Sequence, residues 1–158
     1  MQVLIKRFDE LSLDELHDIL QLRVARFVVE QECAYQEVDG FDKQAIHVML
    51  LDDSAPADAP VQERILAYCR VLPAGCTFEE TSLGRVIATK RHRGYGSRVL
   101  EEGIRVAREM LHAPALTIEA QTYASGMYRK QGFVQTSDEF LEDGIPHIRM
   151  YLDLEPEA

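Results

Sequence analysis

The spacing of apolar residues near the start of the chain changes from that of a strand to that of a helix. Residues 3–8 alternate only loosely between apolar and polar side chains, but well enough to predict a strand. Ser12 followed by Glu15 forms a capping box, a typical helix start. The apolar residues that recur at helical spacing after it are Leu13, Leu16, Leu20, Val24 and Phe27. The pattern therefore predicts a strand followed by a helix.

Three further strands are predicted one after another. Ile46–Leu51 and Arg64–Leu72 are apolar runs on either side of Asp52–Pro60, a segment of Asp, Ala, Ser and Pro that we interpret as a long hairpin loop. Leu83–Thr89 is the third run. Because no helical pattern separates these runs, we expect them to form an antiparallel meander.

The second half of the chain alternates between helices and strands. Ser97–Leu111 carries one apolar stripe at a period of about 3.6 residues, and Leu116–Gln121 is a short strand. A right-handed crossover through this helix should place the strands at Leu83–Thr89 and Leu116–Gln121 in parallel. Ala124–Gln131 is a short helix that ends at Gly132.

Two strands close the chain. They are expected near Phe133–Phe140 and at Ile145–Asp153, around a turn at Asp143-Gly144. The order of elements is then β-α-β-β-β-α-β-α-β-β, which is typical of a mixed α/β (α+β) fold. With 158 residues the chain has the length of one domain, which we assign to 1–158.

Composition narrows the classes of function. The chain has 17 Lys and Arg against 27 Asp and Glu, and its formal net charge of -10 argues against nucleic acid as a partner. Three cysteines, one of them Cys69 within an apolar run, suit a reducing cytoplasm. The apolar runs are too short to span a membrane and the N-terminus lacks a signal pattern, so we expect a cytoplasmic protein without membrane contact. The five histidines show no metal-ligand spacing, so we expect no metal site.

One segment of this acidic chain is purely cationic. Residues 81–100 contain no Asp or Glu, and their basic residues are Arg85, Lys90, Arg91, Arg93 and Arg98. Within them lies Arg91-x-x-Gly94-x-Gly96-Ser97, directly after a predicted strand and at a helix start. Glycine permits close approach, and free N–H groups at a helix start bind anions, so the segment predicts a phosphate site. Its spacing matches neither a P-loop nor a dinucleotide fingerprint.

This segment resembles the coenzyme A site of the GNAT superfamily of acyl-CoA-dependent N-acyltransferases. In that family an Arg/Gln-x-x-Gly-x-Gly/Ala segment holds the pyrophosphate, and the preceding strand receives the acyl and pantetheine part. A second family element, Asn-x-x-Ala-x-x-x-Tyr-x-x-x-Gly-Phe, is matched by Gln121, Ala124, Tyr128, Gly132 and Phe133, with Gln121 in place of Asn. The resemblance implies that the coenzyme is bound by Val86, Ile87, Ala88, Arg91, Arg93, Gly94, Tyr95, Gly96, Ser97, Gln121 and Tyr128.

The similarity extends over nearly the whole chain to the ElaA-like branch of this family. The segments that carry it are Leu22-Arg23, 27–31, 35–40 and 142–148, whereas Asp52–Pro60 lies outside it. The resemblance implies a GNAT fold, with a central mixed sheet of about seven strands flanked by helices. It also implies acetyl-CoA as co-substrate and a small-molecule or peptide amine as acceptor. A homodimer is compatible with this kind of fold.

Transfer of an acyl group to an amine needs a deprotonated nucleophile, a polarised thioester carbonyl and a proton for the departing thiolate. Tyr128, with an ordinary pKa of ~10, is protonated at neutral pH and is our expected general acid. The resemblance alone suggests that a backbone N–H within residues 86–88 polarises the carbonyl. An alkylamine with a pKa of ~10.4 must lose a proton before it attacks. The candidate bases are Glu30, Glu119 and His147, and the sequence does not choose among them.

Each candidate also has a structural interpretation. Tyr128 can be a core aromatic with a satisfied hydroxyl, and His147 can be held by a structural hydrogen bond. Glu119 either faces a cleft or pairs with an arginine. Arg85 either joins an ion pair or contacts the ligand.

The acidic segment from Glu30 to Asp42 is open to two interpretations as well. It can attract a cationic acceptor, but solvated loops are the usual fate of such runs, and we expect this for most of its acids. Those acids are Glu30, Glu37, Asp39 and Asp42. The alternative to an acetyltransferase is an acyl-CoA-binding sensor or interaction module without turnover.

Overall fold

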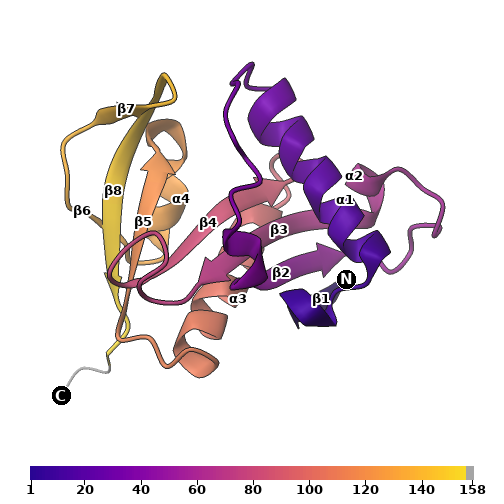
Figure 1. Cartoon of the computed structure of the whole chain (residues 1–158), viewed down its shortest axis with the longest axis horizontal. Coiled ribbons are helices and arrows are strands. Elements are labelled where there is room, and N and C mark those ends of the chain that lie inside the picture. Colours follow the sequence, from indigo (N-terminus) through magenta and orange to yellow (C-terminus); the bar gives the residue numbers. More distant parts are fainter. Residues whose placement is uncertain (156–158) are drawn as a thin grey trace.

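The computed structural model describes residues 1–155, which form one eight-stranded sheet covered by helices (Figure 1). The strands are β1 (Gln2–Arg7), β2 (Ile46–Leu51), β3 (Ile65–Leu72), β4 (Thr81–Ala88), β5 (Ala115–Gln121), β6 (Val134–Gln135), β7 (Phe140–Glu142) and β8 (Ile145–Asp153). The helices are α1 (Leu13–Val24), α2 (Val61–Arg64), α3 (Tyr95–Glu109) and α4 (Ser125–Lys130). The mixed α/β class is confirmed, with eight strands where about seven are expected.

Short helical turns join these elements. The 3-10 turns are η1 (Phe8–Glu10), η3 (Phe41–Lys43) and η4 (Thr122–Ala124). The capping box at the start of α1 is confirmed, since the Glu15 N–H donates to Ser12 Oγ at 3.0 Å and the Ser12 N–H donates to Glu15 Oε1 at 2.8 Å. The predicted helix reaches Phe27, but its last turn, η2 (Ala25–Val29), is π-helical.

The sheet has the order β1-β2-β3-β4-β5-β8-β6, and β7 pairs with β8. The expected meander is confirmed, because β1, β2, β3 and β4 pair antiparallel in succession. The strands β4 and β5 are parallel, also as expected. The loop between β2 and β3 holds the short helix α2, and β5 continues through antiparallel pairing into β8.

The single strand expected at Phe133–Phe140 is wrong, because the chain forms two short strands there, β6 and β7. Ser137 lies between them, and its side chain donates to the Asp138 carbonyl and accepts from the Arg149 N–H. The Gln135 side chain donates to the Ser137 carbonyl. Such local bonds compete with strand pairing and interrupt it.

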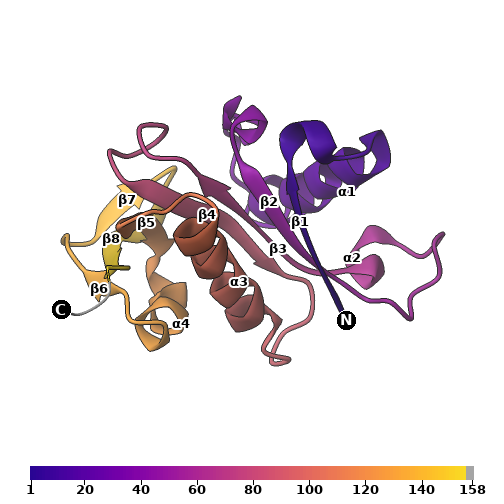
Figure 2. The same cartoon turned by 90° about the horizontal axis from the view of Figure 1, so that it is seen from below.

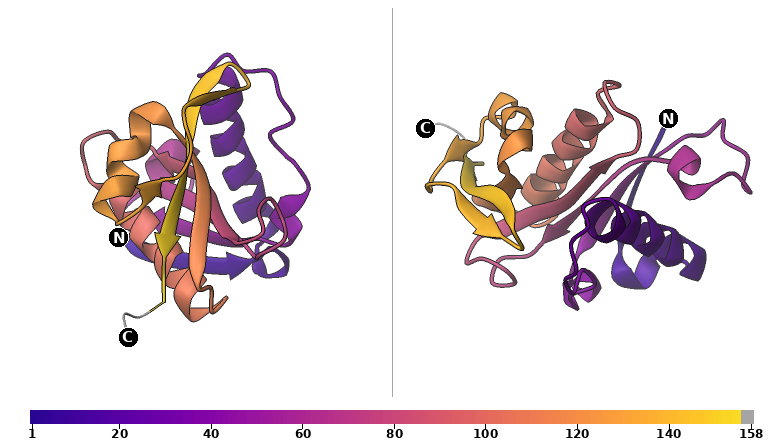
Figure 3. Two further views of the ribbon diagram at one scale, coloured as in Figure 1. Left: turned by 90° about the vertical axis from the view of Figure 1, so that its left-hand side faces the viewer. Right: turned by 90° about the horizontal axis from the view of Figure 1, so that it is seen from above.

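Two apolar cores lie on opposite faces of the sheet (Figures 2 and 3). On one face α1 buries Ile19 and Leu22 against Tyr68 and Ile87. On the other face the apolar stripe of α3 packs on β2, β3 and β4. Gly103 permits this contact, because a Cβ built there would lie 2.4 Å from Leu83 Cδ1.

The two halves of the sheet separate between β4 and β5. These strands pair at only two positions, Thr81 with Leu116 and Ser82 with Thr117, and then diverge (Figure 1). The second half of β4 therefore has no strand on its β5 side. Strands that are hydrogen-bonded along their whole length leave no gap between them. The divergence of β4 and β5 therefore leaves an opening that runs from one face of the sheet to the other.

Candidate active site

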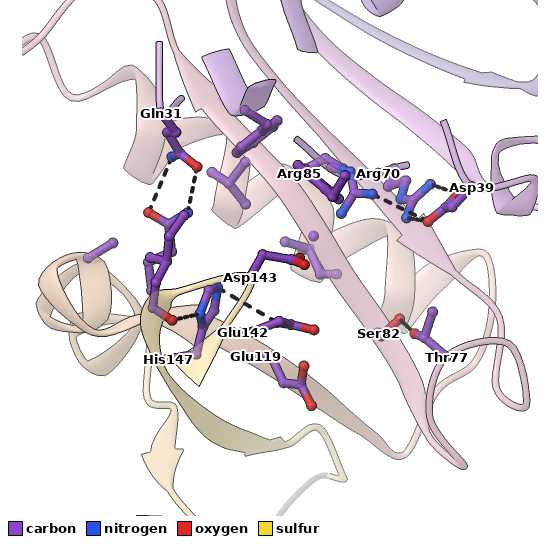
Figure 4. Close-up of a pocket in the computed structure, with 18 of the residues that line it drawn as sticks. Gln31, Asp39, Arg70, Thr77, Ser82, Arg85, Glu119, Glu142, Asp143 and His147 are labelled. Atoms are coloured by element: carbon purple, nitrogen blue, oxygen red, sulfur yellow. Dashed lines mark hydrogen bonds and ion pairs between the residues drawn. The ribbon is translucent and has the colours of Figure 1, made fainter. Parts of the chain in front are cut away.

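A cavity of about 570 Å³ occupies the opening between β4 and β5 (Figure 4). From the α1 side it is lined by Phe27, Gln31 and Tyr35, and from the α4 side by Met127 and Tyr128. It therefore communicates with both faces of the sheet. Five of the residues predicted for function line it, namely Val86, Glu119, Gln121, Tyr128 and His147.

A β-bulge shapes the β4 wall of this cavity. Tyr68 pairs with Ile87 and Arg70 with Gly84, so β4 has one residue more than β3 over this stretch. The extra residue falls at Arg85, whose φ of 54° is unusual for a residue other than glycine. Arg85 thus occupies a strained backbone position beside the cavity.

Beyond the bulge, the backbone of β4 points alternately toward β3 and into the opening. The Thr89 N–H donates to the Leu66 carbonyl of β3, so the polar groups of Ala88 point the other way. The Ala88 carbonyl accepts from Arg26 Nη2 at 2.8 Å. The Ile87 side chain is fully buried in the α1 core, so only its backbone is placed to contact a ligand.

A cluster of six charged side chains, here called the balanced cluster, supports this wall. It joins Arg23, Arg70 and Arg85 to Glu37, Asp39 and Asp42. Glu37 Oε1 lies 2.7 Å from both Arg23 Nε and Arg85 Nε. Three arginines neutralise three carboxylates, and the side chains of Arg23 and Glu37 are 0% and 2% exposed.

The solvated loop expected for the acidic segment is therefore wrong for Glu37 and Asp42. Both are buried because each meets two guanidinium groups. Burial opposes ionisation of Asp39, but hydrogen bonds and the charge of Arg70 lower its pKa to about 2. Arg85 is placed in ion pairs with Glu37 and Asp39.

A second group of charges, here called the open cluster, lies across the cavity on β5, β7 and β8. It comprises Glu119, Glu142, His147 and Arg149. Glu119 Oε1 lies 3.1 Å from Arg149 Nη2. Burial and the neighbouring Glu119 carboxylate raise the pKa of Glu142. Glu142 is not among the residues predicted for function, although it ends β7 just before the turn that leads to His147.

His147 is oriented by its own strand. Its Nδ1 lies 2.7 Å from the Ile145 carbonyl, which can only accept, so Nδ1 carries the proton. Its Nε2 lies 3.7 Å from Glu142 Oε2, and no described residue is within hydrogen-bonding distance of it. The ring therefore presents to the cavity a nitrogen that faces Glu142 but makes no hydrogen bond to a described residue (Figure 4).

Tyr128 is a second polar group at the cavity without a described hydrogen-bond partner, and it lies on the α4 side. It is 8% exposed, and its ring packs edge-to-face on Phe133 at 5.8 Å between centroids. Burial raises the pKa of its hydroxyl, which therefore stays protonated at neutral pH. Within residues 1–155 the hydroxyl has no hydrogen-bond partner, so its proton is available to a ligand in the cavity.

The predicted phosphate segment lies at the end of β4, outside the cavity lining. Gly94, with φ of 77°, is the N-cap of α3, and no side chain caps this helix. The first intrahelical bond runs from the Arg98 N–H to the Gly94 carbonyl, so the N–H groups of residues 95–97 have no helical acceptor. The Arg91 side chain is 85% exposed, and no acid lies in the first turn. These residues fit a diphosphate.

Gly96 allows α3 to pack closely against α4. A Cβ built there would lie 3.1 Å from Met127 Sδ of α4 and 3.7 Å from Ala88 Cβ. The absence of a side chain therefore keeps α3, α4 and the end of β4 together. Of the other predicted residues of the segment, Arg93 directly precedes Gly94, and Tyr95 and Ser97 lie in the first turn of α3.

Two of the predicted residues, Glu30 and Gln121, are engaged with neighbouring side chains. Glu30 is half exposed, lies 3.1 Å from Arg26 and 4.0 Å from Arg91, and does not line the cavity. The structure therefore places it apart from the other two candidate bases, Glu119 and His147. Gln121 lines the cavity, but its amide is paired with that of Gln31 at 3.3 and 3.4 Å.

Residues 1–155 show neither a cluster of metal ligands nor a membrane-spanning helix. No group of three His, Cys, Asp or Glu side chains there is arranged to hold a metal ion. None of the helices in that part of the chain has the length and apolar content that crossing a bilayer requires.

Comparison with known proteins identifies the class. Residues 77–154 match the model of the acetyltransferase (GNAT) domain. The chain is 35% identical to the UPF0039 protein C11D3.02c of Schizosaccharomyces pombe, over 98% of each chain. It is 33% identical to protein ElaA of Escherichia coli, over 89% of each chain.

Solved structures agree with this result. An acyl-CoA N-acyltransferase from Pseudomonas aeruginosa has a TM-score of 0.82 at 34% identity, covering 96% of this chain and 99% of the other. The crystal structure of Escherichia coli ElaA has the same TM-score at 28% identity. The chain belongs to the GNAT acetyltransferase family, in its ElaA-like branch, and is an acyltransferase with the GNAT fold.

Proposed function

We propose that this protein is an acetyl-CoA-dependent N-acetyltransferase whose acceptor is the amine of a small molecule or peptide. The separation of β4 from β5 after two residue pairs carries the proposal. It opens the sheet beside the uncapped start of α3, and the opening contains a hydroxyl and an imidazole nitrogen that no described residue uses. The match to the acetyltransferase domain model favours an acetyl donor.

The donor side of the site is the face that carries α3 and α4. Bound acetyl-CoA would supply the acetyl group as an activated thioester. The free N–H groups of residues 95–97, with Arg91 and Arg93 beside them, would hold its diphosphate. The unpaired side of β4 at residues 86–88 offers the Ala88 N–H as a donor to a carbonyl oxygen. Tyr128 bounds the opening from this face.

The acceptor side is the opposite face, toward α1. Along β5, Ile118 and Ala120 belong to the core under α3, so Glu119 and Gln121 point to the α1 face. By the same alternation His147 of β8 faces α1, because Ile148 belongs to the core. An amine that enters from this side meets the open cluster first.

Two proton positions complete the mechanism. We assign His147 Nε2 as the base, because its tautomer leaves a lone pair directed at the cavity. We assign the Tyr128 hydroxyl as the acid, because burial keeps it protonated and no described residue accepts its proton. His147 takes the proton of the attacking amine, and Tyr128 gives a proton to the departing sulfur.

Titration calorimetry and a thiol-release assay test this function. The full-length protein should bind acetyl-CoA, and free thiol should appear only when an amine is added. Tight binding without transfer over a broad panel of amines would instead favour a sensor or interaction module. Absence of acetyl-CoA binding would refute both functions.

A further inference from the structure

The open cluster holds more acid than base. Glu119 and Glu142 lie close together in the cavity wall (Figure 4), and Arg149, the one guanidinium of the open cluster, pairs with Glu119 alone. Arg149 contacts Glu119 and is half exposed. The basic group nearest to Glu142 among the described residues is His147, whose Nε2 lies 3.7 Å from Glu142 Oε2. When His147 is neutral, as a base must be, one carboxylate charge is left uncompensated.

Asp143 also lines the cavity without an ion pair among the described residues and adds to this negative charge, whereas the acids of the opposite wall do not offer such a charge. Asp39 lines the opposite wall, but it pairs with Arg70 and Arg85. Glu37 and Asp42 are buried among the same arginines, with side chains 2% and 7% exposed. The acidic segment of residues 30–42 therefore does not explain attraction of a cation, whereas β5 and β7 provide a free negative charge.

Two buried polar groups face the same cavity without a partner. His147 is 9% exposed and its Nε2 has no hydrogen bond to a described residue. Tyr128 is 8% exposed and its hydroxyl is equally unpaired within the described chain. Both groups open onto the cavity, so a ligand bound there can supply the partners that the described residues do not.

The chemistry of transfer restricts what this ligand is. The reacting amine must lose its proton before it attacks, so its own positive charge does not persist at the carboxylates. A charge that stays with them must belong to another group of the acceptor. We propose that Glu119 and Glu142 bind a second cationic group of the acyl acceptor, so that preferred acceptors are aliphatic amines with a further ammonium or guanidinium. This inference rests on the proposed acyl transfer.

Three acceptors of similar length test the inference, because they differ only in the charge at the far end. They are 1,5-diaminopentane, pentylamine and 5-aminopentanoate. With acetyl-CoA saturating, kcat/KM should fall about 10-fold from the diamine to pentylamine and further to the amino acid, the size expected for one partly screened ion pair. Equal values for the diamine and pentylamine would overturn the inference and leave the acetyltransferase intact.

A pair of variants identifies the carboxylate. Glu142→Gln should lower the ratio of kcat/KM for diamine over pentylamine about fivefold. Glu139→Gln removes the same charge at an exposed position outside the cavity and should keep the wild-type ratio. A ratio unchanged in Glu142→Gln and in Glu119→Gln would contradict the assignment.

Calorimetric titration of 1,5-diaminopentane into the protein alone gives an independent readout at low ionic strength. Binding that Glu142→Gln weakens about fivefold supports the inference even if none of the three amines is acetylated. Absence of diamine binding overturns it. Failure of the proposed function is recognised separately, by the absence of acetyl-CoA binding in the same protein.

Discussion

Two clusters of charged side chains contribute to one cavity from opposite halves of the sheet, and they differ in how far their charges are matched. The balanced cluster on the β4 side pairs three arginines with three carboxylates. The open cluster on β5, β7 and β8 has two carboxylates, one half-exposed arginine and a histidine with an unused nitrogen.

The difference separates a structural role from a chemical one. Charges that neutralise one another leave no net charge for a ligand, and their burial makes each depend on its partner. Three atoms of the balanced cluster, Glu37 Oε2, Asp42 Oδ2 and Arg70 Nε, are buried without a hydrogen bond in the described chain. The balanced cluster connects α1, the acidic loop, β3 and the strained residue Arg85, so it fixes the β4 wall. Groups that lack partners are available to bind or exchange protons, as the open cluster and Tyr128 are.

The largest effect on activity is expected at Tyr128. Tyr128→Phe removes the proposed acid and should lower kcat by ~10²–10⁴, the range of general acid catalysis. The free energy of unfolding should change little, because the hydroxyl has no described partner to lose. Thiol-release kinetics and urea denaturation measure the two effects. Tyr151→Phe, outside the cavity lining, is the control, and an unchanged kcat in Tyr128→Phe would remove this residue from the mechanism.

The largest effect on stability is expected in the balanced cluster. Arg23→Met leaves Glu37 and Asp42 buried with one guanidinium fewer each, and should lower the free energy of unfolding by about 3–5 kcal/mol. Arg108→Met, at an exposed position of α3, should cost less than about 0.5 kcal/mol. Urea denaturation compares them. Equal losses would show that the balanced cluster is not structural.

A smaller effect is expected from acid. The pKa of Asp39 is about 2 in the folded protein and near 4 when unfolded, so its ionisation stabilises the fold fully above pH 4. This contribution, about 2 kcal/mol, should disappear as the pH falls from 4 to 2. Asp39→Asn should flatten the fall of unfolding free energy over this range, whereas Asp138→Asn, at an exposed position, should not. Parallel curves for Asp39→Asn and wild type would contradict the pairing with Arg70.

The smallest effect is expected at Arg149. Its side chain is half exposed, so the ion pair with Glu119 should contribute less than about 1 kcal/mol to stability. Arg149→Gln should therefore unfold close to the wild-type urea concentration. A loss comparable to that of Arg23→Met would show that the two clusters do not differ in their structural importance.

Much of the fold was predictable because its signals are local. The capping box of Ser12 and Glu15 and the apolar stripe of α3 depend on residues three or four positions apart. The antiparallel meander followed from apolar runs separated by turn residues. The glycine segment at the start of α3 combined a local backbone requirement, the positive φ of Gly94, with a local absence of acid.

The site was predictable only in part. Glu119, His147 and Tyr128 were candidates from residue type and motif, and all three line the cavity. The sequence does not show whether Glu37 is solvated or buried, because its partners Arg23 and Arg85 lie 14 and 48 positions away along the chain. Glu142 was missed for the same reason, since it meets Glu119 only because β7 pairs with β8 and β8 pairs with β5.

The sequence by itself determined the elements, their order, the anion-binding turn and the family resemblance, because these depend on spacing along the chain. Only the tertiary structure decided which charges neutralise one another and which stay free at the cavity. That decision depends on distances between groups on different strands and on their burial, and neither quantity is a property of a local segment.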